Sequence, residues 1–304
     1  MRAVAVTALG GPGVLRVVER PDPVAGPDEI LVRVRATAVQ PADIAARVGR
    51  IPGGPIEPPF LLGWDFAGDV LAVGDDVTDY RPGNRVAGMV PWHLTRGAVG
   101  AYAELVVARR DWLVGVPDEV DAAEAATVAL NALTARQALA MMPLAAGSTL
   151  LVTGASGGVG GFAVQLAARA GHRVIAVASS DDEEWVGSLG AAEVLPRSAD
   201  LAEVGPVPAV FDAVPVGAAA AAAVADGGTL VATRPGAPLD PTRDVRQETV
   251  LVRLDQPMLA ELMAEVAKGR LRTRVAASLP LAEAAHAHRL VEAGRLRGKI
   301  VLVP

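Results

Sequence analysis

The chain has 304 residues, 51% of them hydrophobic, so it exceeds the usual size of one hydrophobic core and we expect two domains. It has no cysteine and a net charge of −6, which excludes disulfides, thiolate catalysis and cysteine-ligated metal and argues against a nucleic-acid partner. No apolar run approaches the ~20 residues that span a bilayer, and the amino terminus lacks a signal-peptide pattern, so we expect no membrane partner and a cytoplasmic location.

The first part of the chain, to about residue 120, consists of short β-branched runs between glycine- and proline-rich turns. Short strands between such turns predict a mostly β, barrel-like domain. The predicted strands are 3–7, 29–36, 66–73, 85–90 and 102–107. Helical segments are predicted next, at 122–129 and 134–141.

Residues 153–160, with the sequence Thr-Gly-Ala-Ser-Gly-Gly-Val-Gly, are the most informative segment of the chain. They lie between an apolar run and a segment with helical spacing, and a strand, a glycine-rich turn and a helix in this order form the phosphate-binding corner of a dinucleotide fold. Gly154 permits the tight turn, Gly157 and Gly158 let the backbone approach a pyrophosphate, and Gly160 lets the helix pack close to the strand. The amides of the first helical turn would face the anion, with the helix dipole behind them.

Strands and helices alternate after this corner, which predicts right-handed crossovers and a parallel sheet. The predicted strands are 173–178, 209–213 and 229–232, and the predicted helices between them are 182–189 and 217–224. The chain closes with helices at 259–268 and 281–293 and a strand at 300–303.

A series of motifs in chain order resembles the medium-chain dehydrogenase/reductases, specifically the zinc-independent quinone oxidoreductase branch typified by zeta-crystallin. The motifs are Gly63-Trp64-Asp65-Phe66-Ala67-Gly68, Val73-Gly74, Pro82-Gly83-Asn84-Arg85-Val86 (with Asn84 where Asp is usual), Leu133-Thr134-Ala135, Ala138-Leu139, the glycine corner, Leu189-Gly190-Ala191, Gly227-Gly228 and Gly298-Lys299-Ile300-Val301-Leu302. The resemblance implies an α/β fold: a GroES-like β-barrel domain from residues 1–120 and 268–304, and a Rossmann domain with a doubly wound parallel sheet over 121–267. Homodimers are common in the family, so a homodimer is one of the expected assemblies.

The sequence predicts that no zinc is bound. Zinc-dependent members of the family have a Cys at the position of Gln40 and a His at that of Trp64, whereas an indole offers zinc no lone pair and an amide is a poor substitute for a thiolate. The histidines fall at no useful ligand spacing and are predicted to be solvated or edge residues; they are His93, His172, His286 and His288. Without a Lewis acid, the simpler chemistry is hydride transfer from a nicotinamide cofactor to an electron-poor small molecule, a quinone or an activated (enone-type) alkene.

Gln40, Trp64 and Tyr102 are the main candidates for the substrate cleft, and Trp92 is a further one. The Gln40 amide could donate a hydrogen bond to a substrate carbonyl, or it could be an ordinary loop residue. Trp64 could stack on a flat substrate or serve only in packing. Tyr102 is the nearby phenol that could donate a proton, and no general acid stands out.

The expected cofactor is NADPH, with NADH as the alternative. An acid at the tip of the second nucleotide-domain strand binds the ribose hydroxyls of NAD and repels the 2′-phosphate of NADP. By the resemblance this tip is 178–180, and Ser179 and Ser180 favour NADPH, but the acidic run 181–184 follows at once. Arg173 and Arg197 are candidate partners for the phosphate. The remaining expected cofactor contacts are Thr134, Gly154, Ser156, Gly157, Gly158, Val159, Gly160, Ala213, Val214, Thr233 and Lys299.

Two functions stay open at this stage. The first is an NADPH-dependent reductase of quinones or activated alkenes. The second is a catalytically idle, NADPH-binding sensor or scaffold of the same fold, an alternative that the lack of an identifiable proton donor supports.

Overall fold

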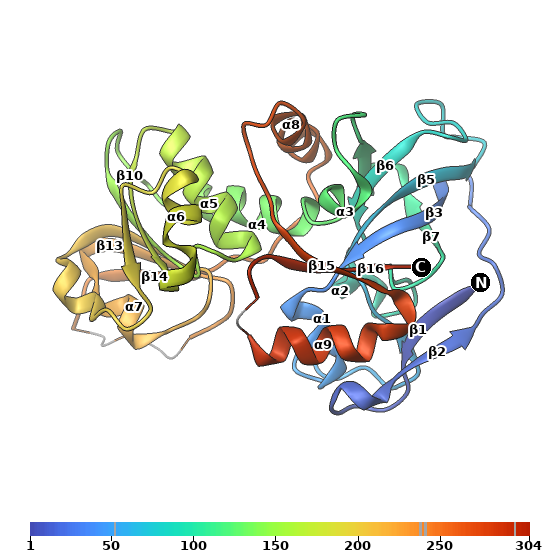
Figure 1. Cartoon of the computed structure of the whole chain (residues 1–304), viewed down its shortest axis with the longest axis horizontal. Helices are drawn as coiled ribbons and strands as arrows, with labels where there is room; N and C mark the ends of the chain where they lie inside the picture. Colours follow the sequence, from blue (N-terminus) through green and yellow to red (C-terminus); the bar gives the residue numbers. More distant parts are fainter. Residues whose placement is uncertain (52, 237–238, 240–241, 295) are drawn as a thin grey trace. The chain divides into compact units, whose positions relative to one another are not determined.

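The computed structural model describes residues 1–51, 53–236, 239, 242–294 and 296–304, and of His93 the backbone alone. The chain forms two compact units (Figure 1): unit 1 comprises Met1–Leu130, Leu254–Arg270 and Arg274–Pro304, and unit 2 comprises Asn131–Arg253 and Leu271–Thr273. Both ends of the chain contribute to unit 1, and so do residues 121–130 and 254–267, which the sequence prediction assigned to the nucleotide-binding domain. Within the described ranges, no helix has the length and apolar character needed to cross a membrane.

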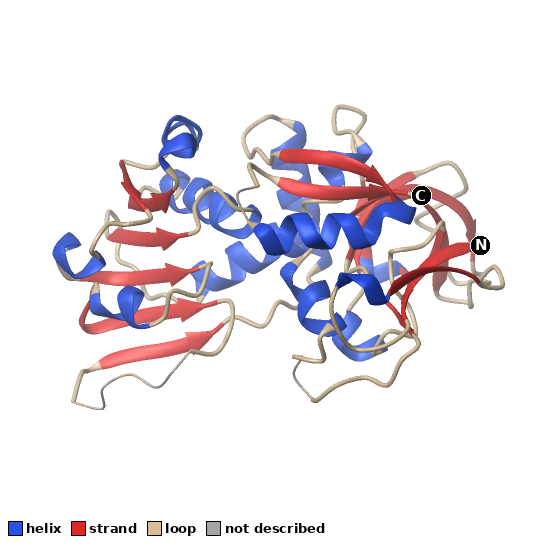
Figure 2. Cartoon of the chain, turned by 60° about the horizontal axis from the view of Figure 1, so that its bottom comes forward, coloured by secondary structure: helices blue, strands red, loops and turns tan. Residues whose placement is uncertain are grey.

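Unit 2 is built on a six-stranded sheet in which all neighbouring strands are parallel. In sheet order the strands are β11 (Glu193–Pro196), β10 (Arg173–Ala178), β9 (Thr149–Thr153), β12 (Val207–Asp212), β13 (Val224–Ala232) and β14 (Val245–Thr249). Figure 2 shows them as red arrows that point the same way. The strand order reverses at β9, which has β10 on one side and β12 on the other. Open parallel sheets bind ligands beyond the carboxyl ends of the strands at such a reversal.

The sequence explains why β9 takes the central place. Its residues Leu150, Leu151 and Val152 are fully buried, as expected of a continuous apolar run in a parallel sheet covered on both faces. The helices of this unit follow the predicted alternation: most of α4 (Ala129–Ala140), then α5 (Gly158–Arg169), α6 (Glu183–Ser188) and α7 (Ala218–Ala222). The α/β class and the Rossmann-like sheet are therefore confirmed.

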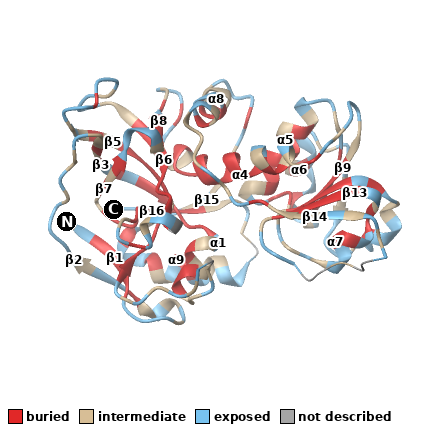
Figure 3. Cartoon of the chain, turned by 180° about the vertical axis from the view of Figure 1, so that it is seen from behind, coloured by how far each residue is buried: buried red, intermediate tan, exposed pale blue. Residues whose placement is uncertain are grey.

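Unit 1 is mostly β, as predicted. Its larger sheet contains β15 (Val275–Pro280), β16 (Lys299–Val303), β3 (Glu29–Ala38), β5 (Asp65–Val73), β6 (Arg85–Met89) and β8 (Leu113–Gly115) in that order, with β7 (Leu105–Arg109) also paired to β3. A smaller sheet contains β2 (Leu15–Glu19), β1 (Arg2–Val6) and β4 (Phe60–Leu61). The helices are α1 (Pro41–Arg47), α2 (Trp92–Thr95), α3 (Ala122–Ala125), α8 (Gln256–Ala267) and α9 (Ala284–Ala293). Figure 3 shows buried residues concentrated along the strands of this sheet, where Ile30, Val32 and Phe66 have no exposed surface.

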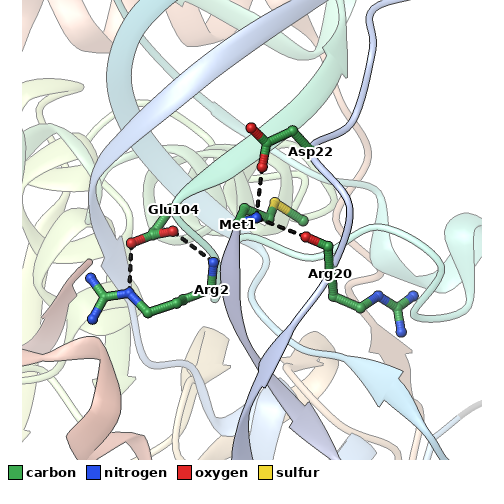
Figure 4. Close-up of polar contacts among 5 residues, drawn as sticks. All are labelled: Met1, Arg2, Arg20, Asp22 and Glu104. Carbon is green, nitrogen blue, oxygen red and sulfur yellow. Dashed lines mark hydrogen bonds and ion pairs between the residues drawn. The ribbon is translucent and has the colours of Figure 1, made fainter.

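The amino-terminal strand is fixed at its start by polar contacts (Figure 4). The amino group of Met1 donates to the carbonyl of Arg20 at 2.7 Å and to Asp22 Oδ1 at 2.6 Å. The amide and the Nε of Arg2 both donate to the carboxylate of Glu104, at 2.6 and 2.7 Å. These contacts hold β1 in register between β2 and the segment that leads into β7.

Candidate active site

The glycine corner of unit 2 has the conformation that its sequence predicts. Gly154, directly after β9, has a φ of +60°, and a methyl group placed on it would lie 2.3 Å from Val214 Cγ2. A methyl group on Gly160 would lie 2.2 Å from the carbonyl oxygen of Gly154, so helix and turn approach each other as closely as their backbones allow. Gly158 packs against the amide of Asn131, whose Oδ1 would lie 2.7 Å from an added Cβ.

The amino end of α5 provides the chemistry that an anion requires. Gly157 is the N-cap residue and has no side chain to cap the helix. The amides of residues 158–160 occupy the first turn, where a helix has no carbonyl for them, and their dipoles add to that of the helix. The corner therefore fits the pyrophosphate of a dinucleotide. Ser156 lies in the same turn and is largely buried.

The other expected cofactor residues of unit 2 lie mostly at the same edge of the sheet. Ala213 and Val214 follow β12, Thr233 follows β13, and Ser179 follows β10. Parallel strands place their carboxyl ends on one edge, and Thr233 Oγ1 donates to the carbonyl of Ala213 at 3.2 Å. Thr134 instead lies within α4 and is 6% exposed.

Asp212 is a residue of this edge that the sequence analysis missed. It ends β12 and is buried. Its carboxylate accepts hydrogen bonds from Thr153 Oγ1 at 2.6 Å and from the amides of Val216 and Gly217 at 2.9 and 3.0 Å. The carboxylate thereby joins the ends of β9 and β12 and shapes the loop that carries Val214. The available signal was an acidic residue closing a buried apolar run.

The tip of β10 combines hydroxyls with acids. Ser179 Oγ donates to Asp182 Oδ2 at 2.9 Å, and Asp182 is 2% exposed whereas Ser180 is exposed. Pro196 of β11 pairs with Ala178, so the exposed Arg197 follows directly beside this tip. Arg173 lies at the opposite end of β10 and pairs with Glu193 at 2.7 Å. Of the two candidate phosphate partners, the fold therefore brings Arg197 to the tip.

Unit 1 contains a buried polar cluster at one end of its larger sheet. β16 and β3 are antiparallel, with Val301 opposite Ala38, so the register carries Lys299 toward Gln40 just past the end of β3. The Nζ of Lys299 donates to Gln40 Oε1 at 2.6 Å, and Gln40 Nε2 donates to Asp65 Oδ2 at 2.6 Å. We call Lys299, Gln40 and Asp65 the lysine–amide–carboxylate triad.

Hydrogen bonds from the backbone hold the triad in place. Asp65 Oδ1 accepts from the amide of Leu130 at 2.8 Å, and Gln40, the N-cap of α1, is held through its own amide by Asp43 Oδ2 at 2.8 Å. Gln40 is 1% exposed and Asp65 is fully buried. The side-chain oxygen of Gln40 and one of its N–H groups therefore have partners inside the protein.

Tyr102 is fully buried beside the triad rather than open to solvent. Its hydroxyl lies 3.3 Å from Asp43 Oδ2 and 3.2 Å from His288 Nε2. Asp43 also accepts from the amide of Gly63 at 2.9 Å. The prediction that His288 is a solvated or edge residue is wrong: it is fully buried, because it lies on the core-facing side of α9 together with Ala284 and Ala287.

Burial dominates the electrostatics of this region. Desolvation raises the pKa of Asp43 to about 6 and that of Asp65 to about 7, although hydrogen bonds from Gln40 and neighbouring amides oppose the shift. Desolvation lowers the pKa of Lys299 to about 8, while Asp65 and Asp43 act to raise it. It also raises the pKa of Tyr102 well above its usual range. A phenol so placed is a poor proton donor near neutral pH.

Trp64 lies at the edge of an aromatic cluster and is partly exposed. Its ring centroid is 6.2 Å from that of Trp92, which in turn lies 5.8 Å from Phe60. Trp92 is buried, and its Nε1 donates to the carbonyl of Leu61 at 2.8 Å. The cluster thus supports the Trp64 ring from behind and leaves part of its surface accessible.

The donor atoms at the positions of the relatives' zinc ligands do not suit zinc. Gln40 presents its oxygen to an ammonium group, and Trp64 presents an indole. Among the residues that the structure describes, which exclude the side chain of His93, no group of three His, Cys, Asp or Glu could hold a metal ion.

Comparison with known proteins assigns the family. The alcohol dehydrogenase GroES-like domain matches residues 26–118, and the zinc-binding dehydrogenase domain matches 189–302. A quinone oxidoreductase of Pseudomonas aeruginosa is 31% identical over 100% of this chain and 99% of its own length, and a chloroplast envelope quinone oxidoreductase homolog of Arabidopsis thaliana is 32% identical over 97% and 95%. The quinone oxidoreductase structure from Coxiella burnetii superimposes with a TM-score of 0.88 at 28% identity, covering 100% and 99% of the two chains. The chain therefore belongs to the medium-chain dehydrogenase/reductase superfamily, among its quinone oxidoreductases, and is an NAD(P)H-dependent oxidoreductase.

Proposed function

We propose that this enzyme is a zinc-independent, NADPH-dependent reductase that transfers a hydride to a quinone or an activated, enone-type alkene. The observation that carries the proposal is the lysine–amide–carboxylate triad, which places an ammonium group against Gln40, at the position where zinc-dependent relatives have a metal ligand. A cation is thus present without a metal, and acceptors that are already electron-poor need no stronger polarisation.

The proposed cofactor site uses the carboxyl edge of the unit 2 sheet. A bound dinucleotide supplies the hydride, and the amides at the amino end of α5 would hold its pyrophosphate. The residues proposed to contact it are Thr134, Gly154, Ser156, Gly157, Gly158, Val159, Gly160, Ser179, Ser180, Ala213, Val214, Thr233 and Lys299.

NADPH is proposed over NADH because Ser179 and Ser180 follow the end of β10, and Arg197 follows the residue of β11 that pairs with that end. Hydroxyls and a guanidinium can bind a 2′-phosphate, Arg in a bidentate manner. The carboxylate of Asp182 opposes this preference, but it is buried and accepts the Ser179 hydroxyl. Replacing Ser179 with Asp should reverse the preference, because a second acid at the tip repels the phosphate and accepts from the ribose hydroxyls. Unchanged use of NADPH by S179D would remove Ser179 from the phosphate site.

For the substrate, we propose that Trp64 provides a stacking surface for a flat acceptor. Gln40 and Tyr102 are both buried and would act through their hydrogen bonds, Gln40 by orienting Lys299 and Tyr102 by fixing Asp43.

The proposal also includes a cytoplasmic location and a homodimer, which cell fractionation and size-exclusion chromatography would test.

The decisive experiment measures oxidation of NADPH and NADH with a panel of quinones and enones, before and after treatment with a zinc chelator. Turnover that survives chelation supports the proposal. Binding of NADPH without turnover of any acceptor would instead support a catalytically idle sensor or scaffold. Loss of turnover on chelation and its return with zinc would contradict zinc independence.

A further inference from the structure

Arginine far outnumbers lysine among the basic residues of this chain. Of 28 Lys and Arg residues, only Lys268 and Lys299 are lysines. Lys268 is largely exposed, with its Nζ 3.9 Å from Glu265, whereas Lys299 is partly buried in the triad. An Arg guanidinium keeps its proton at any pH that a protein experiences, but a Lys ammonium can release one when buried. At position 299, therefore, a partly buried Lys can release a proton that an Arg would keep.

The triad fixes the direction of the Lys299 ammonium. Asp65 is held by the amide of Leu130 and accepts from Gln40 Nε2, so the oxygen of the Gln40 amide must face Lys299. An ammonium carries three N–H groups. Within the described part of the chain, one of them has an acceptor, which is Gln40 Oε1. The remaining donors can serve an oxygen that arrives from outside the protein.

The charges around Lys299 come from two elements. Asp43 on α1 and Asp65 on β5 are the titratable groups that act on it, and both favour its protonated form, while burial disfavours it. The balance lowers the pKa of Lys299 to about 8. An acid of this strength is protonated at neutral pH and can still give up its proton readily, which is the range in which general acids are most effective.

We propose that Lys299 is the proton donor of the reduction, held in position by Gln40 and Asp65. This inference rests on the proposed function. As the hydride adds to the acceptor carbon, the electron pair of the reduced double bond moves onto the acceptor's carbonyl oxygen. That oxygen takes a proton from Nζ: one N–H bond breaks, one O–H bond forms, and Lys299 is left as a neutral amine. Water returns the proton before the next turnover.

The first test reads the lysine itself, without substrate or cofactor. In protein labelled with ¹⁵N-lysine, two Nζ signals are expected, and the one absent from K299R should titrate near pH 8. K268R, which alters the exposed lysine, identifies the other signal. Gln40→Glu adds a negative charge against the ammonium and should move the Lys299 titration to higher pH. A Lys299 signal that stays protonated above pH 10 would overturn the proposal.

The second test measures the catalytic parameters of the variants. K299R keeps the positive charge but cannot release the proton, so kcat/KM should fall about 100-fold, the low end for loss of a general acid, while the dissociation constant for NADPH changes little. In the wild type kcat/KM should decline above pH 8, and in Gln40→Glu this limb should move with the NMR titration. K268R should behave as the wild type.

The outcomes separate this inference from the proposed function. A wild type that reduces no quinone or enone overturns both. An active wild type with an equally active K299R overturns only the role of Lys299 as a proton donor. A K299R variant that loses NADPH affinity but keeps kcat would make Lys299 a cofactor contact and nothing more. If K299R fails to fold, Gln40→Glu decides whether Lys299 donates the proton. A parallel shift of the NMR titration and of the pH profile of kcat/KM supports this role. A shift of the NMR titration alone overturns it, because the pH profile would not follow the titration of a purely structural lysine.

Discussion

The hydroxyl of Ser179 donates a hydrogen bond to Asp182 Oδ2 at 2.9 Å, so a carboxylate lies directly behind the serine at the tip of β10. A phosphate bound there needs a compensating cation. Arg197 is the candidate, because it follows the residue of β11 that pairs with the end of β10. We therefore propose that nucleotide preference depends on Arg197, the residue that directly follows the neighbouring strand β11.

We predict that Arg197→Ala raises the KM for NADPH about tenfold, equivalent to about 1.4 kcal/mol, and leaves the KM for NADH within twofold. The loss is specific because NADH has no 2′-phosphate. Arg173→Ala is the matched control, since Arg173 lies at the other end of β10 and pairs with Glu193. Steady-state kinetics with both nucleotides checks the prediction, and equal losses with NADH and NADPH would contradict it.

The packing of the glycine corner leads to a second prediction, for Gly160→Ala. The added methyl group would lie 2.2 Å from the Gly154 carbonyl, and backbone rather than a flexible side chain must move. We expect a loss of about 1–3 kcal/mol in stability together with weaker nucleotide binding. Gly187→Ala, in α6 with no heavy atom within 4 Å of the new methyl group, should be neutral or stabilising.

Thermal unfolding with and without NADPH measures both effects. The nucleotide should raise the unfolding temperature of the wild type and of Gly187→Ala, because a ligand of the folded state stabilises it by mass action. It should raise that of Gly160→Ala much less. A Gly160→Ala variant as stable as Gly187→Ala, with the full nucleotide response, would show that the corner relaxes at no cost.

A strand can be predicted from the sequence where its pattern of apolar and polar residues matches the burial of its side chains. β10 occupies exactly the predicted residues, Arg173–Ala178, because all but its first residue are buried. β11 was missed, since its residues are exposed or half-buried and it ends on Pro196. The strand predicted at 102–107 begins later, at Leu105, because Tyr102 and Ala103 are instead engaged with β1: the amide of Val4 donates to the Tyr102 carbonyl at 2.8 Å.

In the candidate site, what could be predicted depends on whether the residues lie close together in the sequence. The glycine corner is contiguous in sequence, so its conformation could be predicted. The triad could not, because Gln40 lies 25 positions from Asp65 and 259 from Lys299, and only the register of β16, β3 and β5 brings them together. Gln40 and Lys299 belong to separate segments, and no pattern within either segment indicates that one side chain binds the other.

A third prediction concerns Arg47, a fully buried side chain on α1. Its Nη2 donates to Glu292 Oε1 on α9, while its Nε and Nη1 have no partner among the described residues. Glu292→Gln should therefore lower the free energy of unfolding by about 3 kcal/mol, as expected when a buried charge loses its counter-ion. The double variant Arg47→Met/Glu292→Gln should recover much of this loss.

The control for that prediction is Glu193→Gln, which breaks the exposed pair with Arg173 and should cost less than about 1 kcal/mol. Chemical denaturation compares the three variants, with one probe in unit 1 for the Glu292 variants and one in unit 2 for Glu193→Gln. Equal costs for Glu292→Gln and Glu193→Gln would mean that Arg47 is solvated in the folded protein.

The fourth prediction follows from His288. Desolvation, reinforced by the charge of Arg47, lowers the pKa of this imidazole to about 3 in the folded chain. Between that value and the ordinary pKa of about 6.5, the unfolded chain binds a proton at this site that the folded chain does not. The contribution of His288 to stability is therefore complete above pH 6.5 and is lost as the pH falls toward 3, by up to about 1.4 kcal/mol for each pH unit.

Replacing His288 with Gln should remove this dependence, because the amide can still bond to Tyr102 but does not titrate. Asp43 has the opposite linkage, since its raised pKa makes the folded state lose stability as the pH rises toward 6, so the comparison must be between variant and wild type across one pH series. His286→Gln, two residues away on the exposed face of α9, is the control and should retain the wild-type slope. The free energy of unfolding from pH 4 to 7 checks this. If His288→Gln and the wild type fall in parallel, the imidazole is protonated without cost in the folded protein, and the buried contact with Tyr102 does not require its neutral form.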